Sequence, residues 1–312
     1  MRGQIPSVDL ALRTNNTIVH QPMPIIIGAP RSGTTLLRFI LDSHPELAIP
    51  PETGFLALGP QFAIQGAALR KEFFRAVINF PPDAPGWQDF QIPEQIFWAK
   101  LMEINPFKVS EGYRAFYRLY ASRFPKPRWG DKTPIYCYHM EAIEAVLPEA
   151  YFIHIIRDGR DVSLSLRQMW FSPGWEIETQ ANHWSNFVLS ARRQGAHCSH
   201  YMEVHYEQLI LNTRATVRRV CEFLDLEYDD AMLSYYERTP QRLQEHEGRS
   251  RPDGSLVLTK EQRFRQQQRT TEPPDCSCVF GWKLAMSIEE RTRFEAVAGG
   301  LLRELGYEIE ES

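Results

Sequence analysis

The most informative segment of this chain is Pro24-Ile-Ile-Ile-Gly28-Ala-Pro-Arg31-Ser32-Gly33-Thr34-Thr35-Leu-Leu-Arg-Phe-Ile-Leu41. Its β-branched run, Ile25 to Ile27, is typical of a strand buried in a parallel sheet. Gly28 and Gly33 bracket a tight loop, and the residues from Thr34 onward predict the first turns of a buried helix. A strand, a glycine loop and a helix N-terminus in this order form an anion site, because loop N–H groups and the positive end of the helix dipole converge on one phosphate.

The loop nearly matches the P-loop pattern G-x-x-x-x-G-K-[ST]. Gly28, Gly33 and Thr35 occupy pattern positions, but Thr34 replaces the lysine and the positive charge lies at Arg31. A nucleoside triphosphatase without that lysine loses its main contact to the outer phosphates. The sequence therefore indicates a phosphate-binding loop rather than a triphosphatase, with a βα turn that is merely glycine-rich as the alternative.

Composition narrows the class of protein. The chain has 312 residues, 43% hydrophobic and 24% charged, and a formal net charge of −4, so no basic excess points to nucleic acid. No apolar run approaches the roughly 20 residues of a membrane-spanning helix. The N-terminus is polar without a signal-peptide core, and five irregularly spaced cysteines argue against a disulfide scaffold. We expect a cytoplasmic enzyme.

The order of segments predicts a single α/β domain over residues 1–312, with a central P-loop-like parallel sheet flanked by helices. Strands are expected at 25–27, 151–156 and 201–205, alternating with helices. We interpret residues 1–22 as a lead-in and 55–128 as an aromatic-rich helical insertion on the substrate side, and for most of its aromatic residues a place in the core is the favoured interpretation. Residues 239–278 are polar and predict a C-terminal lid loop, before a closing helix at 287–305.

A second anion site is predicted after the strand at 151–156. In a P-loop triphosphatase a comparable strand ends in an aspartate that holds magnesium, but here the next residue is Arg157. An arginine at this edge of the sheet binds an anion and cannot ligate a cation. Ser165 follows two helical turns later, where its hydroxyl can join Arg157 on one phosphate. The pattern predicts a nucleotide with two separated phosphates and no metal; the alternative for Arg157 is a structural pair with Asp158 or Asp161.

These motifs resemble those of sulfotransferases that use 3′-phosphoadenosine 5′-phosphosulfate (PAPS), and within them the tyrosylprotein sulfotransferases and related bacterial enzymes. The resemblance implies PAPS as co-substrate. Its 5′-phosphosulfate would lie on Arg31, Ser32, Gly33, Thr34 and Thr35, and its 3′-phosphate on Arg157 and Ser165. Tyr206 matches the position that stacks on adenine, and Arg269 is a candidate contact from the lid.

The same resemblance assigns the catalytic groups. Glu52 occupies the position of the general base, which takes the proton of the attacking hydroxyl. Lys132, in Gly-Asp-Lys-Thr-Pro, matches the lysine that stabilises the departing phosphate oxygen, and Arg31 adds positive charge there. An exposed turn acid and a solvated loop lysine are the alternatives for Glu52 and Lys132.

The predicted reaction is in-line transfer of a sulfuryl group from PAPS to an acceptor hydroxyl, without a metal. The sequence does not choose among small-molecule, lipid, carbohydrate and peptide acceptors, and it leaves the oligomeric state open. Two other functions stay possible at this point: a P-loop kinase or phosphotransferase with an atypical loop, and a catalytically silent nucleotide-binding protein. Histidines and cysteines at 197–205 and 276–278 lack the paired spacing of a structural metal site.

Overall fold

A computed structural model describes residues 12–14, 17–62 and 67–309 of the chain. Most of the predicted lead-in, residues 1–11 and 15–16, lies outside the described residues. The described part of the lead-in holds a short antiparallel pair, β1 (Leu12–Thr14) and β2 (Thr17–Val19). Within the described ranges, no helix is long and apolar enough to cross a membrane.

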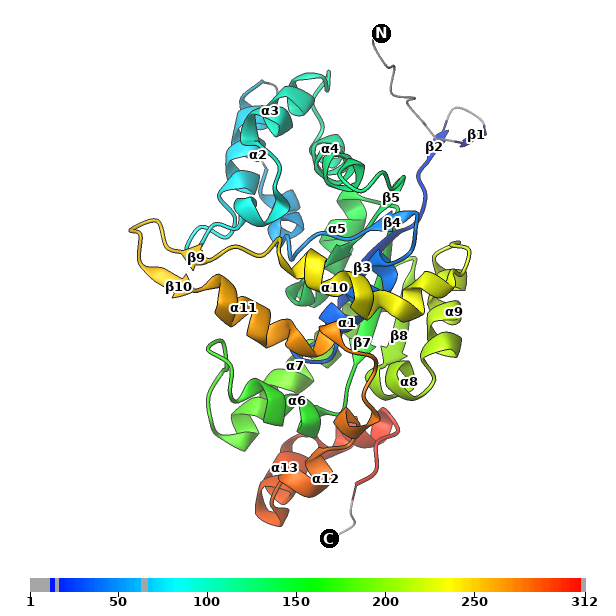
Figure 1. The fold of residues 1–312 in the computed structure, drawn as a ribbon, viewed down its shortest axis with the longest axis vertical. Helices are drawn as coiled ribbons and strands as arrows, with labels where there is room; N and C mark the ends of the chain where they lie inside the picture. Colours follow the sequence, from blue (N-terminus) through cyan, green and yellow to red (C-terminus); the bar gives the residue numbers. More distant parts are fainter. Residues whose placement is uncertain (1–11, 15–16, 63–66, 310–312) are drawn as a thin grey trace.

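The centre of the molecule is a parallel sheet with strand order β6-β3-β7-β8, so the predicted α/β fold with a central parallel sheet is confirmed (Figure 1). Its strands are β3 (Met23–Ile27), β6 (Asp131–Lys132), β7 (Ala150–Ile156) and β8 (Tyr201–His205). The predicted strands at 25–27, 151–156 and 201–205 are β3, β7 and β8. The edge strand β6 is not among the predicted strands, because two residues carry no alternation pattern that distinguishes a strand.

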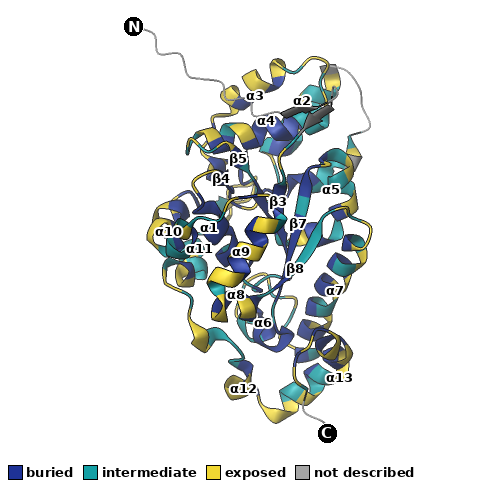
Figure 2. Ribbon diagram, turned by 90° about the vertical axis from the view of Figure 1, so that its right-hand side faces the viewer, coloured by how far each residue is buried: buried dark blue, intermediate teal, exposed yellow. Residues whose placement is uncertain are grey.

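Helices cover both faces of the sheet (Figure 2). On one face, α1 (Thr34–Asp42), α8 (Tyr206–Leu211) and α9 (Thr213–Phe223) share a core with Ile26 and Ile153. On the other, α6 (Gly159–Leu166), α7 (Ile177–Gly195) and α13 (Ile288–Glu304) share a core with Ile25 and Phe152. Successive strand residues thus enter opposite cores, which explains why these strands read as continuous apolar runs.

The segment 55–128 folds into helices above one end of the sheet: η1 (Phe55–Gln61), α2 (Ala67–Ile78), η2 (Trp87–Phe90), α3 (Glu94–Met102) and α4 (Val109–Ser122) (Figure 1). Phe73, Phe97, Phe116 and Tyr120 are fully buried and Trp87 nearly so, with ring centroids 5.0 Å apart between Trp87 and Phe97. Most aromatic residues of the insertion therefore form its own core.

Short elements connect these parts. They are β4 (Leu47–Ala48), β5 (Arg128–Trp129), η3 (Pro134–Tyr138), α5 (Met140–Val146), η4 (Asp230–Ser234), α10 (Tyr235–Leu243) and α12 (Trp282–Ala285). β4 pairs in parallel with β5, which places the chain after β4 beside the chain that leads into β6. The closing helix α13 begins at the predicted capping box, in which Ser287 and Glu290 bond each other's backbone N–H groups.

The structure corrects the description of residues 239–278 as a loop. This segment starts in α10 and continues through β9 (Arg249–Ser250), β10 (Leu256–Leu258), α11 (Lys260–Gln267), η5 (Gln268–Thr271) and η6 (Cys276–Cys278). Thr259 and Gln262 form a capping box that starts α11. This Thr-x-x-Gln signature is present in the sequence, but the helix buries no residue, so no apolar periodicity marks it.

Candidate active site

A cavity of about 740 Å³ opens at the carboxyl ends of β3 and β7, where parallel sheets bind their ligands. Its walls come from the loops and helix starts after β3, β7 and β8, and its cover comes from the segment 266–285. The predicted ligand contacts that line it are Arg31, Gly33, Thr34, Thr35, Arg157, Ser165, Tyr206 and Arg269. Ser32, Glu52 and Lys132 lie outside this lining.

The loop between β3 and α1 has the backbone of an anion cradle. Arg31 and Gly33 adopt the left-handed region, with φ of 72° and 99°. Such alternation turns successive N–H groups toward one point, and α1 then starts at Thr34 with no side-chain cap and no acid in its first turn. The buried Ser32 hydroxyl has no hydrogen-bond partner among the described residues. An anion fits this loop because it satisfies groups that the protein leaves open.

Arg31 and Arg157 meet at this loop. Arg31 Nε donates to Ser165 Oγ at 3.1 Å, and Arg157 Nη1 donates to the Arg31 carbonyl at 3.3 Å. Arg157 Nη2 donates to the Cys278 carbonyl at 2.8 Å, which ties it to the cover of the cavity. Burial lowers the pKa of Arg31, and the nearby guanidinium groups of Arg157 and Arg269 lower it further. Three guanidinium groups lie close together here, and an anion that binds among them would offset their mutual repulsion.

The carboxylates near Arg157 have other tasks. Asp158 pairs with Arg160, whose Nη2 lies 2.7 Å from its Oδ2. Asp161 lies 3.6 Å from Arg157 Nη2, and it also accepts the Trp282 N–H at 2.8 Å. Arg157 therefore forms no ion pair with Asp158, and its ion pair with Asp161 is a long one. Arg157 Nε has no partner among the described groups.

Tyr206 starts α8 at the floor of the cavity. The Arg157 guanidinium carbon lies 4.4 Å from the centroid of its ring, a cation–π contact. A Cβ atom on Gly33 would stand 2.5 Å from Tyr206 Cδ2, so Gly33 is needed both for its positive φ and for this close approach. Stacking of Tyr206 on adenine stays a prediction.

Glu52 and Lys132 form a second centre, immediately behind Thr35. Lys132 Nζ donates to a Glu52 carboxylate oxygen and, at 3.3 Å, to Thr35 Oγ1. The Lys132 side chain is 4% exposed and that of Glu52 53% exposed, so the ammonium is enclosed while the carboxylate reaches solvent. Burial lowers the pKa of Lys132, and the charge of Glu52 opposes that shift. Because Thr35 also lines the cavity, it joins the two centres.

The short parallel pairings explain this meeting. Lys132 pairs in register with Ile26 on β3, so it stands beside the strand that leads into the glycine loop. Glu52 follows β4, which pairs with β5 just before β6. The chain thus brings Glu52 and Lys132 together through β6 and the β4–β5 pair, elements that the sequence analysis did not include.

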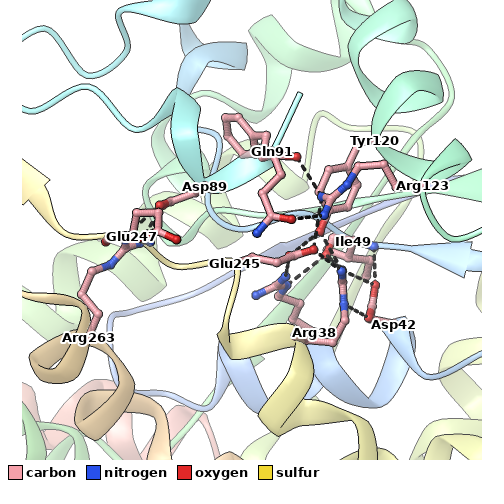
Figure 3. Close-up of polar contacts among 12 residues, drawn as sticks. Arg38, Asp42, Ile49, Asp89, Gln91, Tyr120, Arg123, Glu245, Glu247 and Arg263 are labelled. Carbon is pink, nitrogen blue, oxygen red and sulfur yellow. Dashed lines mark hydrogen bonds and ion pairs between the residues drawn. The ribbon is translucent and has the colours of Figure 1, made fainter. Parts of the chain in front are cut away.

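Buried arginine–carboxylate networks join α10 and α11 to α1 and to the insertion (Figure 3). Arg242 of α10 donates to Asp42 of α1 at 2.8 Å and to Tyr120 of α4 at 2.7 Å. Asp89 of the insertion, fully buried, accepts from Arg249 Nη2 at 2.8 Å and from Arg263 Nη2 at 2.7 Å. Sequence reasoning missed these networks; charged residues inside otherwise apolar helices, such as Arg38 in α1, were the available signal.

Across the described residues, no three histidine, cysteine, aspartate or glutamate side chains gather in a group that would hold a metal ion. The cysteines at 276 and 278 lie on the cover of the cavity instead. Arg269 Nη1 donates to Cys278 Sγ at 3.1 Å, and Cys278 Sγ lies 3.6 Å from Asp275 Oδ2.

Comparison with known proteins agrees with this architecture. A family model described as "Sulfotransferase family" matches residues 22–230. Protein-tyrosine sulfotransferase A of Caenorhabditis elegans is 26% identical over 294 residues, covering 92% of this chain and 67% of that protein. Protein-tyrosine sulfotransferase 1 of Danio rerio is 26% identical over 322 residues, covering 97% of this chain and 79% of that protein. Nodulation protein NoeE of Sinorhizobium fredii is 26% identical over 314 residues, covering 92% and 67%.

Solved structures share the fold. The sulfotransferase domain from the Synechococcus PCC 7002 olefin synthase superposes with a TM-score of 0.60 at 20% identity, covering 93% of this chain and 96% of that one. The sulfotransferase domain from the curacin biosynthetic pathway superposes with a TM-score of 0.57 at 17% identity, covering 93% of this chain and 99% of that one. The chain belongs to the sulfotransferase family. The resemblance drawn from the two anion motifs is confirmed, and the protein is an enzyme, a sulfotransferase.

Proposed function

We propose that this sulfotransferase takes PAPS as co-substrate and transfers its sulfuryl group to an acceptor hydroxyl, with Glu52 as general base. The observation that carries the proposal is the cavity wall. Arg31, Arg157 and Arg269 converge there with the open N-terminus of α1, and Asp161, at 3.6 Å from Arg157, is the carboxylate that pairs with them among the described residues. A nucleotide with separated phosphates is the ligand class that such a wall favours.

The residues divide the work between the two centres. PAPS, when bound, supplies the sulfuryl group. The Glu52 carboxylate, half-exposed beside the cavity, takes the proton of the incoming hydroxyl. The enclosed Lys132 ammonium, held by Thr35 Oγ1, stabilises the negative charge that develops on the departing phosphate oxygen. The Arg31 guanidinium and the loop N–H groups add to that stabilisation without a metal ion.

The names of the relatives, rather than the cavity, support a first choice of acceptor to test. Several proteins that align over most of this chain are named protein-tyrosine sulfotransferases. We therefore place the phenolic hydroxyl of a tyrosine in a peptide first among the acceptors to be screened. Carbohydrate, lipid and small-molecule hydroxyls are the remaining classes in the screen.

The first test is a thermal-shift titration with adenosine 3′,5′-bisphosphate against ATP with magnesium. A ligand at a hundred times its dissociation constant stabilises the folded state by about 2.7 kcal/mol, which raises the melting temperature measurably. We expect stabilisation by the bisphosphate, a clearly smaller stabilisation in Arg157→Ala, and an unchanged one in Arg214→Ala, a control that removes an exposed arginine paired with Asp230. Stabilisation by ATP–magnesium instead would support a kinase and overturn the proposal.

The second test addresses the base. Glu52→Gln keeps the shape of the side chain but cannot accept the proton, so turnover should collapse while bisphosphate affinity is largely kept. Glu103→Gln, an exposed glutamate of the insertion paired with Lys100, is the matched control. Wild-type turnover in Glu52→Gln would show that Glu52 is not the base. A wild-type protein that binds the bisphosphate and transfers sulfate to no acceptor class would favour a catalytically silent binder.

A further inference from the structure

Behind the Glu52–Lys132 pair lies a carboxylate to which the proposed mechanism gives no role. Asp131 is fully buried on the edge strand β6. Its Oδ2 accepts hydrogen bonds from Thr53 Oγ1 and from Tyr117 OH, both at 2.6 Å, and its Oδ1 accepts one from Thr133 Oγ1 at 2.8 Å. The donors come from three separate parts of the chain. A carboxylate buried among three hydroxyl groups is a costly arrangement unless those bonds hold something in place.

The bonds continue into the segment after Glu52. The Thr53 N–H donates to Thr133 Oγ1 at 3.2 Å, and Thr53 Oγ1 lies 2.7 Å from Tyr136 OH. Tyr136 OH in turn accepts the Leu56 N–H at 2.9 Å. No strand pairing holds residues 53–56 to the segment 131–136 in the described structure. Hydrogen bonds of side-chain hydroxyl groups around Asp131 hold these two segments together instead.

Two links therefore join the same two segments. Lys132 binds Glu52, and the neighbouring residue Asp131 binds Thr53, the residue next to Glu52. Successive residues of an extended strand point to opposite sides, which places Lys132 at the reaction centre and Asp131 in the interior behind it. The inner link does not depend on the charge of Glu52. It persists when Glu52 takes a proton and its attraction to Lys132 weakens.

Resting on the proposed roles of Glu52 and Lys132, we infer that Asp131 is a positioning residue, which through Thr53 keeps the base at a fixed distance from the lysine during turnover. Tyr117, on α4 of the insertion, donates to the same carboxylate but has no contact with Glu52 or Lys132 among the hydrogen bonds described above. Burial raises the pKa of the Asp131 carboxyl, and the hydrogen bonds from Thr53, Tyr117 and Thr133 limit that rise. The group is thus supported as an acceptor for all three hydroxyls.

Thr53→Val and Thr53→Ser test the inference directly. Valine keeps the shape of the side chain but removes the hydroxyl, and turnover should fall about tenfold to a hundredfold, because a displacement of about 1 Å in a reacting group costs that much. Serine restores the hydroxyl and should restore most of the turnover. Bisphosphate affinity should be unchanged in both variants, since Thr53 is absent from the cavity lining.

Tyr117→Phe is the comparison variant, because it removes a hydrogen bond of the same length from the same oxygen and leaves the Thr53 hydroxyl, with its own bond to Asp131, in place. The discriminating readout is the alkaline limb of the pH–rate profile. In Thr53→Val, Glu52 moves away and no longer raises the pKa of Lys132, so the limb should shift to lower pH. In Tyr117→Phe and Thr53→Ser the limb should stay in place.

The outcomes separate this inference from the proposed function. If Glu52→Gln is inactive but Thr53→Val keeps wild-type turnover, the positioning role is wrong and the general base stands. If Thr53→Val and Tyr117→Phe lose equal turnover with no shift of the limb, Asp131 is structural only. If Glu52→Gln itself keeps wild-type turnover, the proposed base fails first. Asp131→Asn, where it folds, should lose turnover as Thr53→Val does, and its alkaline limb should lie at still lower pH, because the charge of Asp131 also raises the pKa of Lys132.

Discussion

The cavity wall and the Glu52–Lys132 centre differ in how closely their positively charged side chains are paired with carboxylates. In the wall, Arg31 and Arg269 form no ion pair in the described structure, and Arg157 has a single carboxylate at 3.6 Å. At the centre, the enclosed Lys132 is bonded directly to Glu52. Thr35 belongs to both regions, since it lines the cavity and accepts from Lys132 Nζ.

This contrast in charge pairing indicates which step of the reaction each region serves. The wall holds three arginines and, at 3.6 Å from Arg157, the carboxylate of Asp161. Cations that are paired this weakly gain much from an anion that stays bound, so the wall suits the lasting phosphate groups of a nucleotide. A carboxylate and an ammonium in contact form a neutral unit that can take up a proton at one end and face a new negative charge at the other. If this division is correct, variants in the two regions will separate affinity from turnover.

Lys132→Ala should have the largest effect, and it should fall on turnover. Loss of a group that stabilises a developing oxyanion costs about 10²–10³-fold in rate. The wall cations remain, so bisphosphate affinity should fall far less. Single-turnover kinetics and calorimetry measure the two quantities, with Lys100→Ala, an exposed lysine of α3, as the control. An equal loss of turnover and of bisphosphate affinity would contradict the proposed division of roles between the two regions.

Arg157→Ala should show the reverse pattern. A hydrogen bond to a charged group contributes about 1.5–3 kcal/mol, so bisphosphate affinity should fall about tenfold to a hundredfold. Turnover at saturating co-substrate should change little, because the contact is the same in the ground state and the transition state. Ser165→Ala removes only a neutral hydroxyl and should cost less. Turnover that collapses in Arg157→Ala at saturation would place Arg157 in the chemical step.

The strands and the cavity wall were largely predictable from the sequence. Long apolar runs such as Tyr151 to Ile156 specify buried parallel strands on their own, because both faces must be covered. The glycine loop and Arg157 carry their chemistry in a local pattern. These features depend on neighbours in the sequence, which a single chain displays directly.

The support behind the reaction centre was not predictable. Asp131 and Thr53 are 78 residues apart, and their hydrogen bond depends on β6, which has two residues. The contacts of Asp89 with Arg249 and Arg263 span 160 and 174 residues. Polar residues in loops look solvated in a sequence, since only the tertiary fold decides that they are buried and paired.

Asp89→Asn should have a smaller effect that connects the two regions through the lid. α11 is clamped to Asp89 at Arg263, and at its other end the Gln266 carbonyl accepts from Arg31 Nη1 at 3.3 Å. An uncharged partner leaves Arg249 and Arg263 poorly paired, so the lid closes less often and bisphosphate affinity should fall roughly threefold to fivefold. Limited proteolysis of the lid should speed up in parallel. Asp83→Asn, an exposed residue of the same insertion, is the control; equal affinity in both variants would uncouple the lid from the cavity.

The smallest effect is expected in the pH dependence of kcat/KM, and it concerns the reaction centre alone. The active form requires Lys132 as an ammonium, and burial lowers its pKa below the ordinary value of 10.5. Activity should therefore decline on the alkaline side at a pH below that value. Lys132→Arg keeps a positive charge throughout this range, because an arginine does not lose its proton there, so its residual activity should show no such decline.

Cys278, a thiol that also lines the cavity, is the competing group, and Cys278→Ser should keep the alkaline decline of the wild-type protein. If the alkaline decline of kcat/KM persists in Lys132→Arg and vanishes in Cys278→Ser, the titrating group is Cys278 in the cavity wall. That result would contradict the role given to Lys132 in the comparison of the two regions.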